Sequence, residues 1–304
     1  MRKSVFMFIF LFLFNTTAVA EVRPVRKALS DGVKVVATLP WIGSIINDIG
    51  KEKVEVTVLV KSNQDPHQIE AKPGMILQTR KADILAYNGL DLEIGYLPVL
   101  IESSRNPKIQ AGKPGNLDCS QYVTPIEKSL SADRSMGDVH PFGNPHYHLS
   151  PKNILKAAEG ISERLSAIDP ANADFYRANL VSFREKLKEK QKLWSIKQLK
   201  GKRVVAYHKM FEYLAAEFGF EIIGYLEPKP GIPPSAGHIE KLIGIMQKAK
   251  PEAILTTAYY GRKEAQFISQ KTGVSVITVP HDVGAAEKAK DWFTLMDHVL
   301  ATLE

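Results

Sequence analysis

The stretch Ala171–Lys197 reads ANADFYRANLVSFREKLKEKQKLWSIK and contains neither glycine nor proline. Aromatic and leucine side chains recur in it at helical spacing among glutamates and lysines, which predicts one long amphipathic helix. With a rise of 1.5 Å per residue, such a helix is about 40 Å long, which is enough to run along two domains. The organisation of the chain therefore depends on what lies on either side of this helix.

Strands and helices alternate on both sides of the predicted helix. Before it, apolar runs predict strands at 34–40, 54–60 and 83–87 and helices at 73–82, 91–102 and 151–168. After it, strands are predicted at 203–207, 221–226, 253–257 and 275–279, with helices at 210–218, 239–250, 262–271 and 292–303. Because such alternation implies parallel βαβ units, we expect an α/β fold with two βα-repeat lobes, residues 33–170 and 199–304, joined by a linking helix at 171–198.

The first twenty residues have the order of a secretory signal peptide. Arg2 and Lys3 precede an apolar run at 5–14, and Ala18-Val19-Ala20 supplies the small residues of a cleavage site. The apolar run is short for a transmembrane span, although an uncleaved anchor is the competing interpretation. No cysteine lies near residue 20, which argues against a lipid-modified N-terminus there. We therefore expect cleavage after residue 20 and a periplasmic or extracytoplasmic location.

Composition excludes several classes of site. The only cysteine is Cys119, so the chain can form neither an internal disulfide nor a cysteine-based metal cluster. The net charge is +7, but the basic residues are dispersed, and the densest stretch, 184–202, mixes them with glutamates at helical spacing. We expect a solvated helix face there and no nucleic-acid partner.

Histidines follow the predicted strands in both halves of the chain. His67 lies beyond the strand that ends at residue 60, and His208 and the His281-Asp282 pair follow strands of the second half. His146 lies in a loop rich in glycine and proline. Ligands of open α/β sheets bind beyond the carboxyl ends of the strands, so these side chains can meet if the two edges face each other. Imidazole and carboxylate suit zinc, which predicts a transition-metal site in the cleft between the lobes.

The remaining histidines have simpler interpretations. His140 and His148 flank His146 and are expected to be exposed loop residues. The alternative is that one of them hydrogen-bonds to a metal ligand or captures the metal with low affinity. His238 is expected at a helix start as a surface or capping group, and His298 is expected to be structural. The chain contains none of the H-E-x-x-H, G-x-S-x-G, P-loop or G-x-G-x-x-G motifs, so no enzymatic activity is indicated.

Four short motifs, in order, resemble those of one family. They are Asp65-Pro-His67-Gln-Ile-Glu70, Asn144-Pro-His146-Tyr-His-Leu-Ser-Pro151, Ala206-Tyr-His208-Lys-Met-Phe-Glu-Tyr213 and the turn Asp282-Val-Gly284. Together they are similar to the metal-binding solute-binding proteins of bacterial ABC transporters for zinc and manganese. The resemblance covers residues 33 to 304, including the long helix. The second motif differs from the Asp-Pro-His common in the family, and the His-rich loop of many zinc-specific members is absent.

The resemblance implies a ligand set and a function. His67, His146 and His208 would bind the metal, with Asp282 in the fourth position and His281 as the rival. Three nitrogen donors suit Zn²⁺ better than Mn²⁺, although Mn²⁺ stays possible. The implied protein is a monomeric receptor, not an enzyme, which captures a divalent metal ion and delivers it to an ABC transporter membrane permease. The alternatives are an exported zinc-dependent hydrolase and a metal-stabilised adhesin.

Overall fold

The computed structural model describes residues 32–128, 140–260 and 262–304. The predicted signal peptide, residues 1–20, lies outside these ranges. Within them, no helix combines the length and the apolar character that crossing a bilayer requires.

The first lobe is built on a parallel sheet in the order β2-β1-β3-β4. Its strands are β1 (Val33–Ala37), β2 (Val54–Val58), β3 (Ile84–Tyr87) and β4 (Asn116–Asp118). Its helices are α1 (Pro40–Gly50), α2 (Pro73–Arg80), α3 (Leu97–Ser104) and α4 (Pro151–Ile168), with short 3-10 turns at η1 (Lys51–Lys53) and η3 (Cys119–Tyr122). The central strands β1 and β3 are mostly buried, as parallel strands covered on both faces should be.

The second lobe repeats this arrangement. Its parallel sheet has the order β6-β5-β7-β8, formed by β5 (Arg203–Ala206), β6 (Glu221–Tyr225), β7 (Ala253–Thr256) and β8 (Ser275–Thr278). Its helices are α6 (Glu212–Phe218), α7 (Ala236–Ala249), α8 (Arg262–Thr272) and α9 (Trp292–Leu303). In both sheets the first strand of the lobe lies between the second and the third, so each lobe has a switch point beside that strand.

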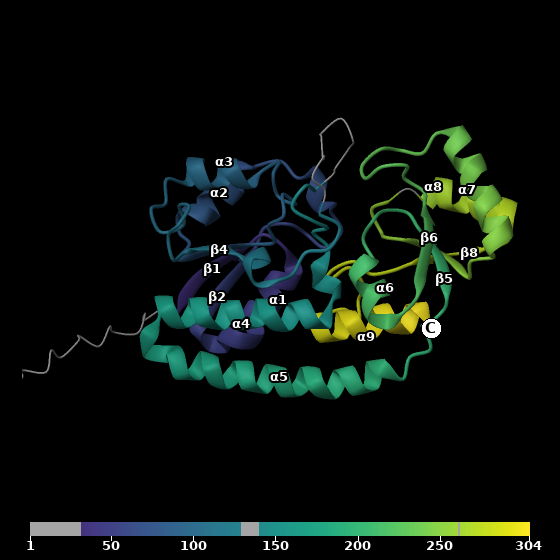
Figure 1. Ribbon diagram of the computed structural model, residues 1–304. Coiled ribbons are helices and arrows are strands. Elements are labelled where there is room, and N and C mark those ends of the chain that lie inside the picture. Colours follow the sequence, from purple (N-terminus) through teal and green to yellow (C-terminus); the bar gives the residue numbers. More distant parts are fainter. Residues whose placement is uncertain (1–31, 129–139, 261) are drawn as a thin grey trace, which may run out of the picture.

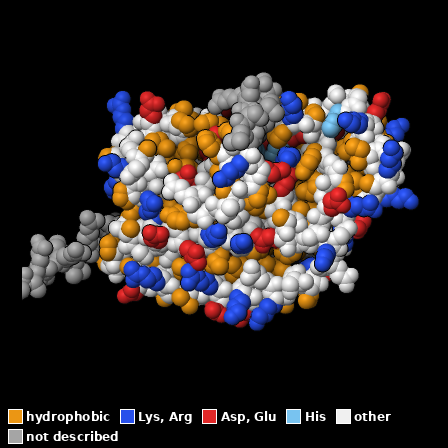
Figure 2. All heavy atoms as spheres, viewed as in Figure 1, with side chains coloured by type: hydrophobic (Ala, Val, Ile, Leu, Met, Phe, Trp, Pro, Cys, Tyr) orange, Lys and Arg blue, Asp and Glu red, His pale blue; other side chains and the backbone are white. Residues whose placement is uncertain are grey.

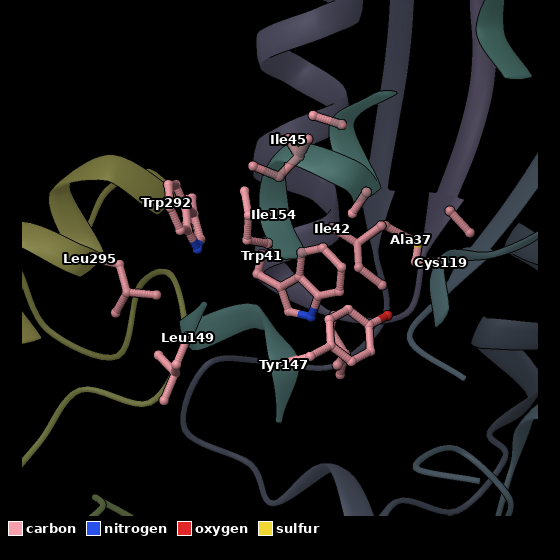
Figure 3. Packing of buried hydrophobic residues seen from close by; sticks show 14 of the residues in the cluster. Ala37, Trp41, Ile42, Ile45, Cys119, Tyr147, Leu149, Ile154, Trp292 and Leu295 are labelled. Atoms are coloured by element: carbon pink, nitrogen blue, oxygen red, sulfur yellow. The ribbon is translucent and has the colours of Figure 1, made fainter. Parts of the chain in front are cut away.

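Two helices bind the lobes together. The helix α5 (Ala173–Ser195), which follows the turn η6 (Pro170–Asn172), runs beneath both lobes (Figure 1). The C-terminal helix α9 returns to contact α1 and α5. Its Trp292 and Leu295 lie in the same buried cluster as Trp41 and Tyr147 of the first lobe (Figure 3). The contact between the lobes therefore has an apolar core.

The expected α/β fold with two parallel sheets and a long helix is confirmed. Two helices differ most from the sequence-based expectation. The helix α1, which begins at Pro40, was not anticipated, and α3 begins at Leu97 rather than at residue 91. Leu90 and Asp91 have positive φ angles of 55° and 61°, which a helix cannot contain, and Pro98 suits the first turn of the later helix.

The charges on the surface are mixed. In Figure 2 the lysine and arginine side chains are interspersed with acidic ones over the face shown, including the length of the long helix along its lower edge. The dense stretch of lysines and glutamates in the sequence is thus a solvated helix face, as its spacing indicates.

Candidate metal centre

His67 is held in the 3-10 turn η2 (Pro66–Gln68), beyond the carboxyl end of β2. Asp65 caps this turn: its carboxylate accepts a hydrogen bond from the backbone N–H of His67 at 3.0 Å and from the ring Nδ1 at 2.9 Å. Because a carboxylate only accepts, Nδ1 carries the proton and Nε2 has a free lone pair. Burial would raise the pKa of Asp65, but the hydrogen bonds from His67 outweigh it and leave that pKa lowered.

His146 lies just before α4, at the start of the 3-10 turn η5 (Tyr147–Leu149). The side-chain carbonyl of Asn144 accepts a hydrogen bond from the backbone N–H of His146 at 2.9 Å. The adjacent Tyr147 is fully buried and donates its hydroxyl to the carbonyl of Asn88 at 2.6 Å. These bonds fix the backbone on both sides of the imidazole.

His208 follows β5 of the second lobe. Its Nδ1 donates to the carboxylate of Glu227 at 2.7 Å, and both side chains are almost fully buried. Glu227 follows the neighbouring strand β6 and also accepts from the backbone N–H of Gly231 at 3.2 Å. A carboxylate on the outer nitrogen of a ligand histidine fixes its tautomer and raises its basicity as a ligand.

The rings of His67, His146 and His208, here called the ligand trio, converge between the lobes. Their ligand nitrogens all lie within 4.8 Å of one another, and the Nε2 atoms of His146 and His208 are 3.2 Å apart. Two nitrogens bound to one tetrahedral zinc, each at about 2.0–2.1 Å, lie roughly 3.3 Å apart. Burial lowers the pKa of His146 and of His208, so both imidazoles are neutral, as metal ligation requires.

His140 is not the exposed loop residue that the sequence suggested. Its Nδ1 donates to the carbonyl of Leu90 at 2.9 Å, and its Nε2 lies 3.2 Å from Nε2 of His67. Burial, with a smaller contribution from the neighbouring His67, lowers the pKa of His140 to about 3. With both Nδ1 atoms donating, two lone pairs face each other at 3.2 Å, an arrangement that a cation between them stabilises.

His281 and Asp282 follow β8 and are buried, as is His148, whose exposure the sequence also overestimated. They line one small hollow together with His146 and Tyr259. Asp282 accepts from the backbone N–H of Val283 at 2.7 Å, and burial raises its pKa to about 8. Within the described residues, the group of metal-capable atoms that lie within 4.8 Å of one another contains the ligand trio but not Asp282.

Two other histidines lie apart from this centre. His238 stands in the first turn of α7, whose N-cap is Ser235, and its Nε2 donates to the carbonyl of Tyr225 at 2.9 Å. His298 lies within α9.

The side chains that orient the ligand trio were not predicted from the sequence. Asp65 lies in one of the four family motifs and Glu227 lies in none, and no role was predicted for either. A signal for both was available: Asp65 stands two residues before a histidine, and Glu227 follows a strand that neighbours β5. Asn144 gave a weaker signal, because only the fold shows what its amide group contacts.

A family model and several known proteins match this chain. The family described as "ZnuA: Zinc-uptake complex component A periplasmic" matches residues 35–304. The manganese ABC transporter substrate-binding lipoprotein PsaA of Streptococcus pneumoniae is 25% identical over 254 residues, which cover 82% of this chain and 80% of that protein. The iron ABC transporter substrate-binding lipoprotein MtsA of Streptococcus pyogenes serotype M1 is 26% identical over 297 residues, covering 95% and 92%.

Solved structures show the same fold. A crystal structure of ZnuA superposes with a TM-score of 0.75 at 25% identity and covers 90% of this chain and 98% of that chain. A manganese-bound periplasmic metal-binding protein from Candidatus Liberibacter asiaticus gives a TM-score of 0.72 at 24% identity, covering 89% and 98%.

Proposed function

Since the chain belongs to the ZnuA family of zinc-uptake components, we propose that this metal-binding receptor of an ABC transporter takes Zn²⁺ as its cargo. Members of this family are solute-binding receptors and not enzymes, so the zinc-dependent hydrolase is set aside. The observation that supports a metal cargo most directly is the convergence of three imidazoles whose ligand nitrogens lie within 4.8 Å.

The identity of the metal as zinc is the more specific part of this proposal. The relatives are named for manganese and for iron as well as for zinc, so the family leaves the metal open. The ligand trio offers nitrogen only, and Mn²⁺ prefers oxygen donors, whereas Zn²⁺ accepts imidazole readily. The carboxylates nearest to the trio, Asp65 and Glu227, are engaged on the outer nitrogens and thus tune the ligands rather than supply oxygen.

The setting of the protein is also proposed. Residues 1–20 would direct export and be removed, and residues 33–170 and 199–304 would form the two lobes that residues 171–198 connect. The mature protein would act as a monomer in the periplasm or another extracytoplasmic space, where it would pass the metal to a membrane permease. The relatives that are named lipoproteins support an extracytoplasmic site of action.

The fourth ligand position has two candidates. Asp282 lies at the carboxyl end of β8 and lines the same hollow as His146, but it must move to reach the ligand trio. His140 already has its Nε2 at 3.2 Å from His67. A carboxylate would lower the net charge of the zinc site, whereas His140 would complete an all-nitrogen shell. The zinc affinities of Asp282→Ala and His140→Ala decide between them, because only the true ligand should give a large loss.

Calorimetric titration with zinc, with metal analysis, tests the function. We expect the mature chain to bind one zinc per molecule. His67→Ala and His208→Ala should weaken binding by more than the roughly 100-fold that loss of an outer partner costs, since each removes a ligand. His238→Ala is the matched control, because that histidine lies outside the site, and it should bind zinc as the parent does. Unchanged zinc affinity in both ligand variants would refute the proposal.

The metal-stabilised adhesin makes a different prediction. The lobes share an apolar core that consists of hydrophobic side chains, so a receptor should stay folded when a chelator removes its cargo. Loss of the circular-dichroism signal on chelation would instead favour a structural metal.

A further inference from the structure

Asn144 connects the two lobes next to the ligand trio. Its side-chain carbonyl accepts from the backbone N–H of His146, and its amide group faces three acceptors. These are the carbonyl of Lys209 at 3.2 Å, a carboxylate oxygen of Glu212 at 3.2 Å and one of Glu127 at 3.1 Å. One buried amide thus contacts the backbone of one ligand histidine and the residue directly after another.

The orientation of Asn144 is fixed from several sides. Its backbone N–H donates to the carbonyl of Ile126 at 2.9 Å, and its own carbonyl accepts from the hydroxyl of Tyr213 at 2.8 Å. Gly143 before it has a φ of 122°, and a Cβ there would lie 2.9 Å from the carbonyl of Ile126. The backbone at residue 143 can lie so close to Ile126 only because residue 143 is a glycine.

The acceptors are held as firmly as the donor. The second carboxylate oxygen of Glu212 accepts from the hydroxyl of Tyr225 at 2.9 Å, and that of Glu127 pairs with Lys209 at 2.6 Å. Glu212 lies in the first turn of α6, just after His208. The positions of Glu212 and of the Lys209 carbonyl therefore follow the segment that carries His208.

Only an amide satisfies these surroundings. The residue must accept from one backbone N–H and donate to two carboxylates and a carbonyl, and asparagine can do both. An aspartate at position 144 would still accept from the backbone N–H of His146, but it would place a third carboxylate against Glu127 and Glu212. A buried charge without a partner is costly, so the two segments would move apart.

We propose that Asn144 is a positioning residue that sets the separation of His146 and His208 by joining the segments that carry them. The inference rests on the proposed function, since it assigns a role at the same site. The two Nε2 atoms lie 3.2 Å apart, which is the spacing that two zinc ligands need, and Asn144 contacts both of the segments that carry them.

The variants Asn144→Asp, Glu212→Gln and the double variant test this role by rescue. Asn144→Asp should weaken zinc binding by about 10- to 100-fold, the effect of losing a partner that orients a ligand. In the double variant, the new amide at position 212 can donate to the new carboxylate at position 144, so zinc affinity should return to within a few-fold of the parent. Glu212→Gln alone keeps an acceptor for the Asn144 amide, so it should weaken zinc binding less than Asn144→Asp does. A residue that merely stabilises the fold would not be rescued by this exchange of charge.

A second measurement follows the distance between the two lobes in the metal-free protein. Spin labels at Lys81→Cys and Lys248→Cys, which are exposed positions in the two lobes, report their separation while Cys119 stays buried. Asn144→Asp should lengthen or broaden the distance distribution of the metal-free protein, and the double variant should restore it. Parent-like distances together with parent-like zinc affinity in Asn144→Asp, or a double variant as weak as the single one, would overturn the inference. Because this measurement needs no metal, it separates failure of the inference from failure of the proposed function.

Discussion

Two groups of histidines lie side by side between the lobes, and they use their nitrogens in opposite ways. In the ligand trio, Nδ1 of His67 and of His208 donates to a carboxylate, and the Nε2 atoms face one another. His148 and His281, here called the latch pair, meet through a backbone bond instead. Nε2 of His148 donates to the carbonyl of His281 at 2.7 Å, and its ring stacks on Trp41.

The contrast shows that histidines that are all buried can still differ in the hydrogen-bond partners of their two nitrogens. Burial lowers the pKa of His146 and His208 in the trio and of both latch residues, to about 4 for His148 and about 3 for His281. All of them are therefore neutral near pH 7. What differs is the partner of the second nitrogen: an anchored Nδ1 leaves Nε2 free for a metal, whereas a donating Nε2 ties the lobes together.

Replacing one member of each group should separate the two roles most clearly. His146→Ala should weaken zinc binding by more than the roughly 100-fold expected for an outer partner. His148→Ala should weaken zinc binding by less than about 10-fold, the low end of the effect of an outer partner. It should instead lower the free energy of unfolding by about 2 kcal/mol, because a hydrogen bond and packing are lost. Calorimetry and urea unfolding of the metal-free proteins measure the two effects. Equal losses of zinc affinity in both variants would remove the distinction between the groups.

The effect of the carboxylate that accepts from Nδ1 of His208 can be tested by changing Glu227. Glu227→Gln keeps an acceptor for Nδ1 of His208 but removes the negative charge, so zinc affinity should fall by about 10-fold, at the low end of the effect of outer partners. Glu240→Gln, at an exposed position on α7, is the matched control. A zinc affinity that is the same in Glu227→Gln and in the control would show that the carboxylate does not tune the ligand.

The latch pair should also contribute to the acid sensitivity of the metal-free protein. The pKa of His148 is lowered to about 4 in the folded chain, against 6.5 in an unfolded one, so below pH 6.5 the unfolded state binds more protons. Stability is therefore lost as the pH falls from 6.5 to 4, by at most about 1.4 kcal/mol per pH unit for this residue. His148→Ala should unfold with a shallower pH dependence in this window. Urea unfolding in the presence of a chelator at pH 7, 6 and 5 measures the slope, and equal slopes would contradict the prediction.

The sequence by itself determined the architecture. Apolar runs with helical or strand spacing predicted the two parallel sheets and the long helix, because this periodicity is local and survives without knowledge of contacts. The start of α3 was predicted too early, since the positive φ angles at Leu90 and Asp91 depend on the surrounding loop. Strand-end positions also indicated His67 and His208, because the carboxyl ends of parallel strands gather at one edge of a sheet. His146, which lies in a loop, was indicated by the family resemblance.

Only the tertiary structure decided what each histidine does. His146 and His148 are two residues apart, and no local rule says that the ring of one faces His208 while the other bonds to a carbonyl of the second lobe. The partners of these rings, from Glu227 to the backbone of His281, come from segments distant in the sequence. A hydrogen bond fixes which ring nitrogen carries the proton, and folding alone brings the bonding partner close. The tertiary structure therefore decides whether a ring nitrogen is free to bind a metal or bonds to the other lobe.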